Sequence, residues 1–126
     1  MYVKQPANSN FSKHYFEFLS HLGFIFLNHG KFDKSADIYN FLDYLSPSDF
    51  RIVFPLTYSL IQEGFPDIAI EKLNCLKGTK DADPVFWFLR AQAFYQLGLP
   101  AEACKAMRTS IRLRNINLQK GPILWR

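Results

Sequence analysis

The sequence predicts an all-α protein made of three tandem helix–turn–helix repeats stacked as a short solenoid. Gly30, Gly64 and Gly98 are spaced 34 residues apart, twice over, and a constant period of this length is typical of such repeats. Large apolar residues stand four positions before each glycine, and small residues stand five positions after: Phe26, Leu60 and Phe94, then Ser35, Ala69 and Ala103. Because these offsets recur, each helical pair is expected to stack on the next.

The length and composition of the chain indicate one folded domain. Its 126 residues are 48% apolar and 17% aromatic, which is enough for a core and unlike a disordered chain. We expect a flexible amino terminus at 1–10, a repeat domain at 11–114 and a carboxyl-terminal tail at 115–126. The three repeats are expected at about 15–48, 49–83 and 84–116.

The chain is expected to be cytoplasmic. Residues 1–10 contain no basic region followed by an apolar run, so no secretory signal is predicted. The most apolar stretch, 16–27, is interrupted by Glu17, Ser20 and His21 and is not a membrane span. Cys75 and Cys104 occupy core-like positions of the helical pattern, and we interpret them as reduced thiols rather than as a disulfide.

The first repeat has the apolar periodicity of two helices. Apolar residues recur at three- and four-residue steps from Asn10 to Gly30, as a helix with one buried face requires. Gly30 permits the turn, and a second helix is predicted at about 32–45. Pro47 ends this helix, because proline disfavours helix in the residue before it, and Ser48 is expected to cap the next helix.

Prolines mark the helices of the second and third repeats. Pro55 lies in the first helix of the second repeat and is expected to bend or delay it, because proline has no N–H to donate. Pro66 suits the first turn of the following helix, and Asp83 followed by Pro84 is a cap–proline pair that opens the third repeat. After Arg114 the apolar periodicity fades.

The sequence resembles the tetratricopeptide repeat family. The residues that match its pattern are Leu22, Gly23, Phe26, Gly30, Phe32, Tyr39, Leu45 and Pro47, then Leu56, Leu60, Gly64, Ala69 and Leu73, then Trp87, Ala91, Phe94, Gly98 and Ala103. Pro55 and the missing terminal proline of the second repeat depart from the pattern. The resemblance implies a right-handed solenoid in which the first helices of the repeats line a concave surface.

Its size and the stretch 87–99 make the chain similar to the small tetratricopeptide-type export chaperones of bacterial type III secretion systems. This resemblance implies a virulence-associated chaperone that binds a small secreted polypeptide, either the needle subunit or a small early-secreted export component. A second chaperone or a second copy of the chain is a further partner that it allows. The alternative is a generic tetratricopeptide adaptor that scaffolds a protein complex.

The repeat register places a mostly aromatic and apolar set of residues on the expected concave groove. The candidate partner-binding residues are Phe24, Leu27, Phe54, Tyr58, Ile61, Phe88, Gln92 and Tyr95. Such a groove suits an amphipathic helix or an extended apolar segment. Family members that hold acidic carboxyl termini use Lys, Arg and Asn at positions that are here Phe24, Pro55, Val85 and Leu89, so no carboxylate clamp is predicted.

No enzyme, metal or cofactor motif is predicted. His14 and His21 are two helical turns apart, about 10 Å, and the chain has no CxxC or HxxxH pair, so no metal site is expected. There is no nucleotide loop and no glycine-framed serine.

Lys105, Arg108 and Arg112 form a basic stripe at helical spacing. We interpret it as a solvated outer face rather than as a nucleic-acid site, because no aromatic residues are interleaved with it. Attraction of an acidic partner is a further use of such a stripe. The partner is accordingly expected to be a protein, with neither nucleic acid nor membrane insertion involved.

Overall fold

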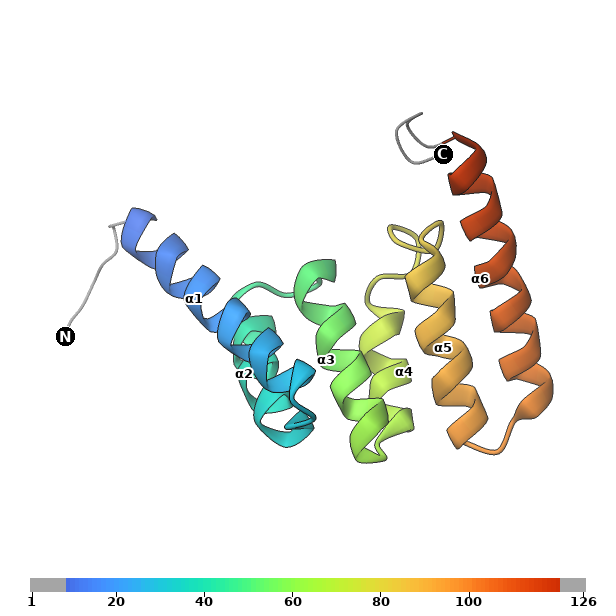
Figure 1. The fold of residues 1–126 in the computed structure, drawn as a ribbon, viewed down its shortest axis with the longest axis horizontal. Coiled ribbons are helices and arrows are strands. Elements are labelled where there is room, and N and C mark those ends of the chain that lie inside the picture. Colours follow the sequence, from blue (N-terminus) through green and yellow to red (C-terminus); the bar gives the residue numbers. More distant parts are fainter. Residues whose placement is uncertain (1–8, 121–126) are drawn as a thin grey trace.

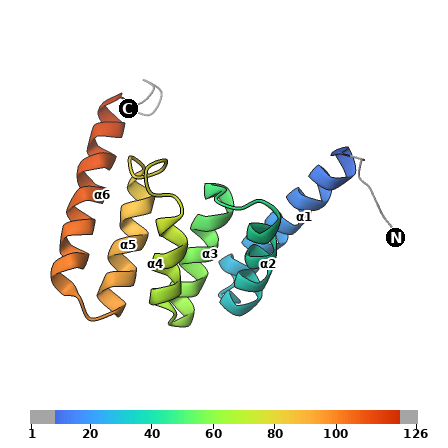
Figure 2. The same cartoon turned by 180° about the vertical axis from the view of Figure 1, so that it is seen from behind.

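The computed structural model describes residues 9–120, which form six α-helices and no strand. The helices are α1 (Ser9–Asn28), α2 (Phe32–Leu45), α3 (Phe50–Glu63), α4 (Pro66–Asn74), α5 (Pro84–Gln96) and α6 (Pro100–Lys120). They follow one another as three antiparallel pairs in a row, with α1 at one end and α6 at the other (Figures 1 and 2). This arrangement confirms the predicted all-α class and its three helical pairs.

The three periodic glycines form the turns within the pairs. Gly30, Gly64 and Gly98 have φ angles of 75°, 89° and 78°, a left-handed conformation that glycine adopts without a steric penalty. Gly64 is the C-cap of α3, and its N–H donates to the carbonyls of Leu60 and Ile61. The 34-residue spacing therefore reflects the same backbone turn made three times.

The small residues five positions after the glycines lie in the interior of the fold. Ser35, Ala69 and Ala103 are all buried. In the first repeat, α1 contributes a second small residue, since a Cβ on Gly23 would lie 2.9 Å from Cε2 of Tyr39. The Tyr39 hydroxyl in turn donates a 2.9 Å hydrogen bond to the carbonyl of Ser20 on α1. The small residues of the repeat pattern are thus buried, and Gly23 lets α1 and α2 approach closely.

Aspartates cap the first helices of the second and third repeats. The Asp83 carboxylate accepts a 2.9 Å hydrogen bond from the N–H of Val85, as the cap–proline pair predicts. The expected Ser48 cap is wrong by one residue: Asp49 caps α3 by accepting from the N–H of Arg51 at 3.0 Å. Ser48 instead has a φ of 61° in the turn that leads into the helix.

Two helix boundaries differ from the sequence expectations. Pro55 does not delay α3, because the helix begins at Phe50 and includes the proline. Residues 115–120, assigned above to the tail, continue α6 to Lys120. Between Pro100 and Gly121 no glycine or proline stops the helix. The loss of apolar periodicity after Arg114 therefore does not end α6. Of the expected flexible terminus, Ser9 and Asn10 begin α1; the rest of it, and residues 121–126, lie outside the described residues.

Specific polar contacts join neighbouring repeats. The Gln96 side chain donates a 2.8 Å hydrogen bond to the carbonyl of Ile61, linking α5 to α3. Lys72 on α4 pairs with Asp43 on α2 at 3.0 Å. These contacts fix how one pair of helices sits on the next.

Both cysteines are free and exposed, so the expectation that they occupy core positions is wrong. Ala103, one residue before Cys104, takes the buried position, and a step of one residue turns the next side chain about 100° around the helix. Within the described residues, none of the helices combines the length and apolarity that crossing a membrane needs.

Candidate protein-binding site

A pocket of about 420 Å³ lies between the first helices of the three repeats. Its lining residues are Phe24 and Leu27 of α1, Phe54, Pro55 and Tyr58 of α3, and Val85, Phe88 and Leu89 of α5. We call this site the α1–α3–α5 pocket. It brings together five of the eight residues predicted from the sequence, namely Phe24, Leu27, Phe54, Tyr58 and Phe88.

The aromatic residues of this pocket differ in how far they are buried. Phe54 and Tyr58 are half-buried against the core, and the Tyr58 ring packs edge-on against Phe32 with centroids 6.0 Å apart. Phe24 and Phe88 are 54% and 41% exposed. The pocket therefore has fixed aromatic walls and two rings whose apolar surface is still in contact with solvent.

The chemistry of the pocket excludes a carboxylate clamp at this place. Phe24, Pro55, Val85 and Leu89 all line it, at the positions where the clamp-type proteins would carry basic or amide side chains. None of the lining residues is charged, and an unpaired carboxylate is costly to bury in such surroundings. Apolar side chains are the groups that this pocket can accept.

The other three predicted residues line a second pocket. Ile61, Gln92 and Tyr95 contribute to a pocket of about 500 Å³ together with Gln62, Ala91, Gln96 and four residues of α6: Pro100, Ala103, Cys104 and Met107. The single predicted groove is thus two pockets in the structure. The α6 residues are absent from the predicted set because the repeat register places binding positions only on the first helices of the repeats.

The histidines and basic residues lie on helix surfaces. His14 and His21 are exposed on α1, and His29 Nδ1 lies 2.8 Å from the carbonyl oxygen of Ile25. No group of three or more His, Cys, Asp or Glu within the described residues could hold a metal ion. Lys105, Arg108 and Arg112 are exposed along α6, which agrees with a solvated face.

Arg90 is half-buried, unlike Lys105, Arg108 and Arg112. Its guanidinium lies 5.2 Å from the ring centroid of Phe94 and donates a 3.0 Å hydrogen bond to Asn74 Oδ1. Burial lowers the pKa of Arg90, an effect that the negative charge of Glu102 opposes. This residue therefore stabilises the packing of α5 against α4.

The chain is similar to a solved structure of a secretion chaperone. The crystal structure of the type III secretion translocator chaperone SycD from Yersinia enterocolitica, in an alternative dimer, aligns with a TM-score of 0.71 and 26% sequence identity. The alignment covers 78% of this chain and 74% of that one. No protein-family model and no curated protein matches the sequence. The structural similarity confirms the resemblance to tetratricopeptide-like type III secretion chaperones.

Proposed function

We propose that this chain is a cytoplasmic type III secretion chaperone that binds a small export substrate in the α1–α3–α5 pocket. The observation that carries the proposal is the uncharged aromatic lining of this pocket in a fold shared with a secretion chaperone. The protein binds a polypeptide and performs no reaction. The substrate would be a needle-type subunit or a small early-secreted component, with its apolar segment covered until export.

The pocket suits side-chain anchors from an amphipathic helix. Fully burying one large apolar side chain contributes about 1.5–3 kcal/mol before the costs of ordering. Covering Phe24 and Phe88 would remove two exposed aromatic rings from water at the same time. A few anchors of this kind are sufficient for a stable complex, and the same anchors would otherwise drive the substrate to aggregate.

The test is affinity purification of the tagged full-length chain from its native host, followed by mass spectrometry. We expect a stoichiometric small secreted protein with the parent chain, and its loss with Phe88→Glu. Tyr44→Glu is the matched control, because Tyr44 is an aromatic residue of α2 that is 82% exposed and lines neither pocket.

Two results would contradict the proposal. Recovery of a large assembly without any secreted protein would favour the generic adaptor. Retention of the secreted protein by Phe88→Glu, with helical circular dichroism unchanged, would show that the α1–α3–α5 pocket is not its binding site.

A further inference from the structure

The third repeat leaves open a face that the second repeat buries. Ile61 and Tyr95 occupy equivalent positions 34 residues apart, yet Ile61 is 2% exposed and Tyr95 is 74% exposed. Leu73 is likewise buried, whereas its equivalent Met107 is only half-buried. The difference follows from the stacking, because α5 packs against both α3 and α4 and no described helix packs in the same way beyond α5 and α6.

The pocket of about 500 Å³, which Ile61 and Gln62 of α3 also line, lies beside this open face. We define the trailing face as Gln92 and Tyr95 of α5 with Cys104, Met107 and Ile111 of α6; the first four line the pocket, and Ile111 continues their stripe one turn further and is exposed. Gln92 Oε1 is buried and has no hydrogen-bond partner among the described residues. An occupant that offers an apolar stripe and one hydrogen-bond donor would complete this face.

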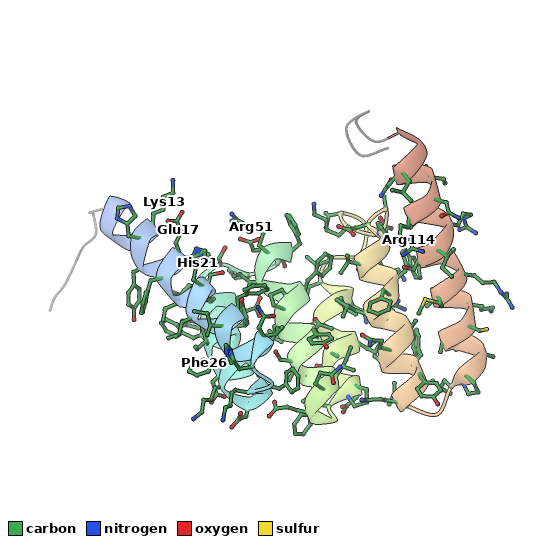
Figure 3. The ribbon with its side chains drawn as sticks, viewed as in Figure 1. Lys13, Glu17, His21, Phe26, Arg51 and Arg114 are labelled. Carbon is green, nitrogen blue, oxygen red and sulfur yellow. The ribbon has the colours of Figure 1, made fainter. Side chains whose placement is uncertain are left out.

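A basic stripe runs beside the apolar one. Lys105, Arg108 and Arg112 each follow a residue of the trailing face by one position, which places them about 100° around α6. All three are exposed. The described part of α6 contains one acidic residue, Glu102, and several basic residues. One of the basic residues, Arg114, is labelled in Figure 3. An occupant of the trailing face would therefore lie alongside positive charge.

We propose that the trailing face binds an amphipathic α-helix of a separate polypeptide, whose apolar stripe is flanked by Asp or Glu. The helical form follows from the second repeat, where the equivalent face is covered by the helix α5. The acidic flank follows from the basic stripe, because opposite charges across an interface favour encounter and fix orientation.

Charge also argues against a second copy of this chain as the occupant. Two trailing faces in contact would bring the same basic stripes together, and like charges at an interface are unfavourable. Contact of the trailing face with the first helix gains no net attraction, since the charged residues of α1 are Lys13 and Glu17, one of each sign. The proposal does not rest on the proposed function, because it concerns a different pocket and a different partner.

The first test uses two synthetic helical peptides of about 18 residues, long enough for a stable helix. Both have the same leucine stripe, flanked by glutamate in one peptide and by lysine in the other. We expect the glutamate peptide to bind the full-length chain about ten-fold more tightly than the lysine peptide, as measured by fluorescence anisotropy. The salt concentration is kept at or below about 0.1 M, where the Debye length is about 10 Å or more and neighbouring charges are not fully screened. Tyr95→Glu should weaken its binding at least about ten-fold, since it adds like charge to an exposed position.

The second test uses Cys104 as a reporter that the trailing face already contains. Saturating glutamate peptide should slow alkylation of Cys104 and leave alkylation of Cys75 unchanged, because both thiols are exposed but only Cys104 lines the pocket. Phe88→Glu, which changes the α1–α3–α5 pocket, should leave both the affinity and the protection of Cys104 unaltered.

Four outcomes would overturn the proposal. Equal binding of the two peptides would remove the role of charge. Loss of binding in Phe88→Glu but not in Tyr95→Glu would assign the peptide to the α1–α3–α5 pocket. Binding that occurs only after deletion of residues 121–126, or a dimer in sedimentation that Tyr95→Glu dissociates, would identify the occupant as the chain's own end or as a second copy.

Discussion

The hydroxyl of Ser59 on α3 donates a 3.1 Å hydrogen bond to the hydroxyl of Ser35 on α2, and both residues are fully buried. Ser35 occupies the small-residue position that is alanine in the other two repeats. The contact between the first and second repeats is therefore fixed by a polar pair within an apolar core, where hydrogen bonds are strong and unpaired hydroxyls are costly.

This pair predicts non-additive stability in a double-mutant cycle. Ser35→Ala or Ser59→Ala alone leaves one buried hydroxyl without its partner, and each should lower the free energy of unfolding by about 1–3 kcal/mol. The double variant should lose less than the sum of the two, with a coupling of about 1 kcal/mol. Urea unfolding followed by circular dichroism measures all four proteins, and strict additivity would mean that the hydrogen bond contributes nothing.

Gly23→Ala should destabilise the protein although alanine favours helix. In a helix interior this change ordinarily stabilises by about 0.5–1 kcal/mol. Here the new Cβ would lie 2.9 Å from the Tyr39 ring, which is buried and bonded to Ser20 and so is held in place. We expect a loss of about 1–3 kcal/mol in chemical unfolding. Ser12→Ala, at an exposed position of α1, is the control for helix propensity; a stabilised Gly23→Ala would show that the two helices separate easily.

Alkaline pH should lower the free energy of unfolding through ionisation of Tyr39. Burial raises the pKa of Tyr39 above its ordinary value of 10.0. Well below pH 10.0 the phenol is neutral in both the folded and the unfolded chain, and its stabilisation is complete. As the pH rises through 10.0 the unfolded chain releases the proton first, and stability falls. Between about pH 9 and pH 11 the free energy of unfolding should therefore fall less in Tyr39→Phe than in the parent. Tyr44→Phe, at an exposed ring, should follow the parent; identical slopes for Tyr39→Phe and the parent would refute the effect.

The cap of α3 predicts a difference between alanine and asparagine at position 49. Asp49→Ala removes the acceptor of the Arg51 N–H and should cost about 1 kcal/mol. Asp49→Asn keeps a side-chain oxygen at that place and should retain most of the stability. Thermal unfolding of the two variants distinguishes them. If Ser48 were the true cap, Ser48→Ala would show the larger loss.

The architecture was predictable because it depends on local requirements that recur. Gly64 marks a left-handed turn that other residues adopt only with strain, and Ala69 marks a fully buried position that takes a small side chain. Both kinds of residue recur with the repeat period. Whether Ser48 or Asp49 caps α3 was not predictable, because both are good capping residues and only the turn geometry separates them.

The site was predictable in part for the same reason. Phe54 and Phe88 share one offset, ten positions before Gly64 and Gly98. Phe24 and Tyr58 share another, six positions before Gly30 and Gly64, and all four line one pocket. The separation of Tyr95 from them depends on the packing of α6 against α5, a tertiary contact that no local pattern encodes. The exposure of Cys104 likewise depends on which side of α6 faces its neighbour.

The row of stacked helical pairs has a mechanical consequence. In such an array each repeat is held by its neighbours, and α3, in the middle, has the most buried residues of the six helices, whereas α1 has few. Thermal opening should then start as fraying of the outer helices and reach α3 last, so that amide hydrogens of α3 exchange with solvent most slowly. A partner bound at one end would stabilise the terminal helices against fraying, and would slow amide exchange in the nearest repeat first.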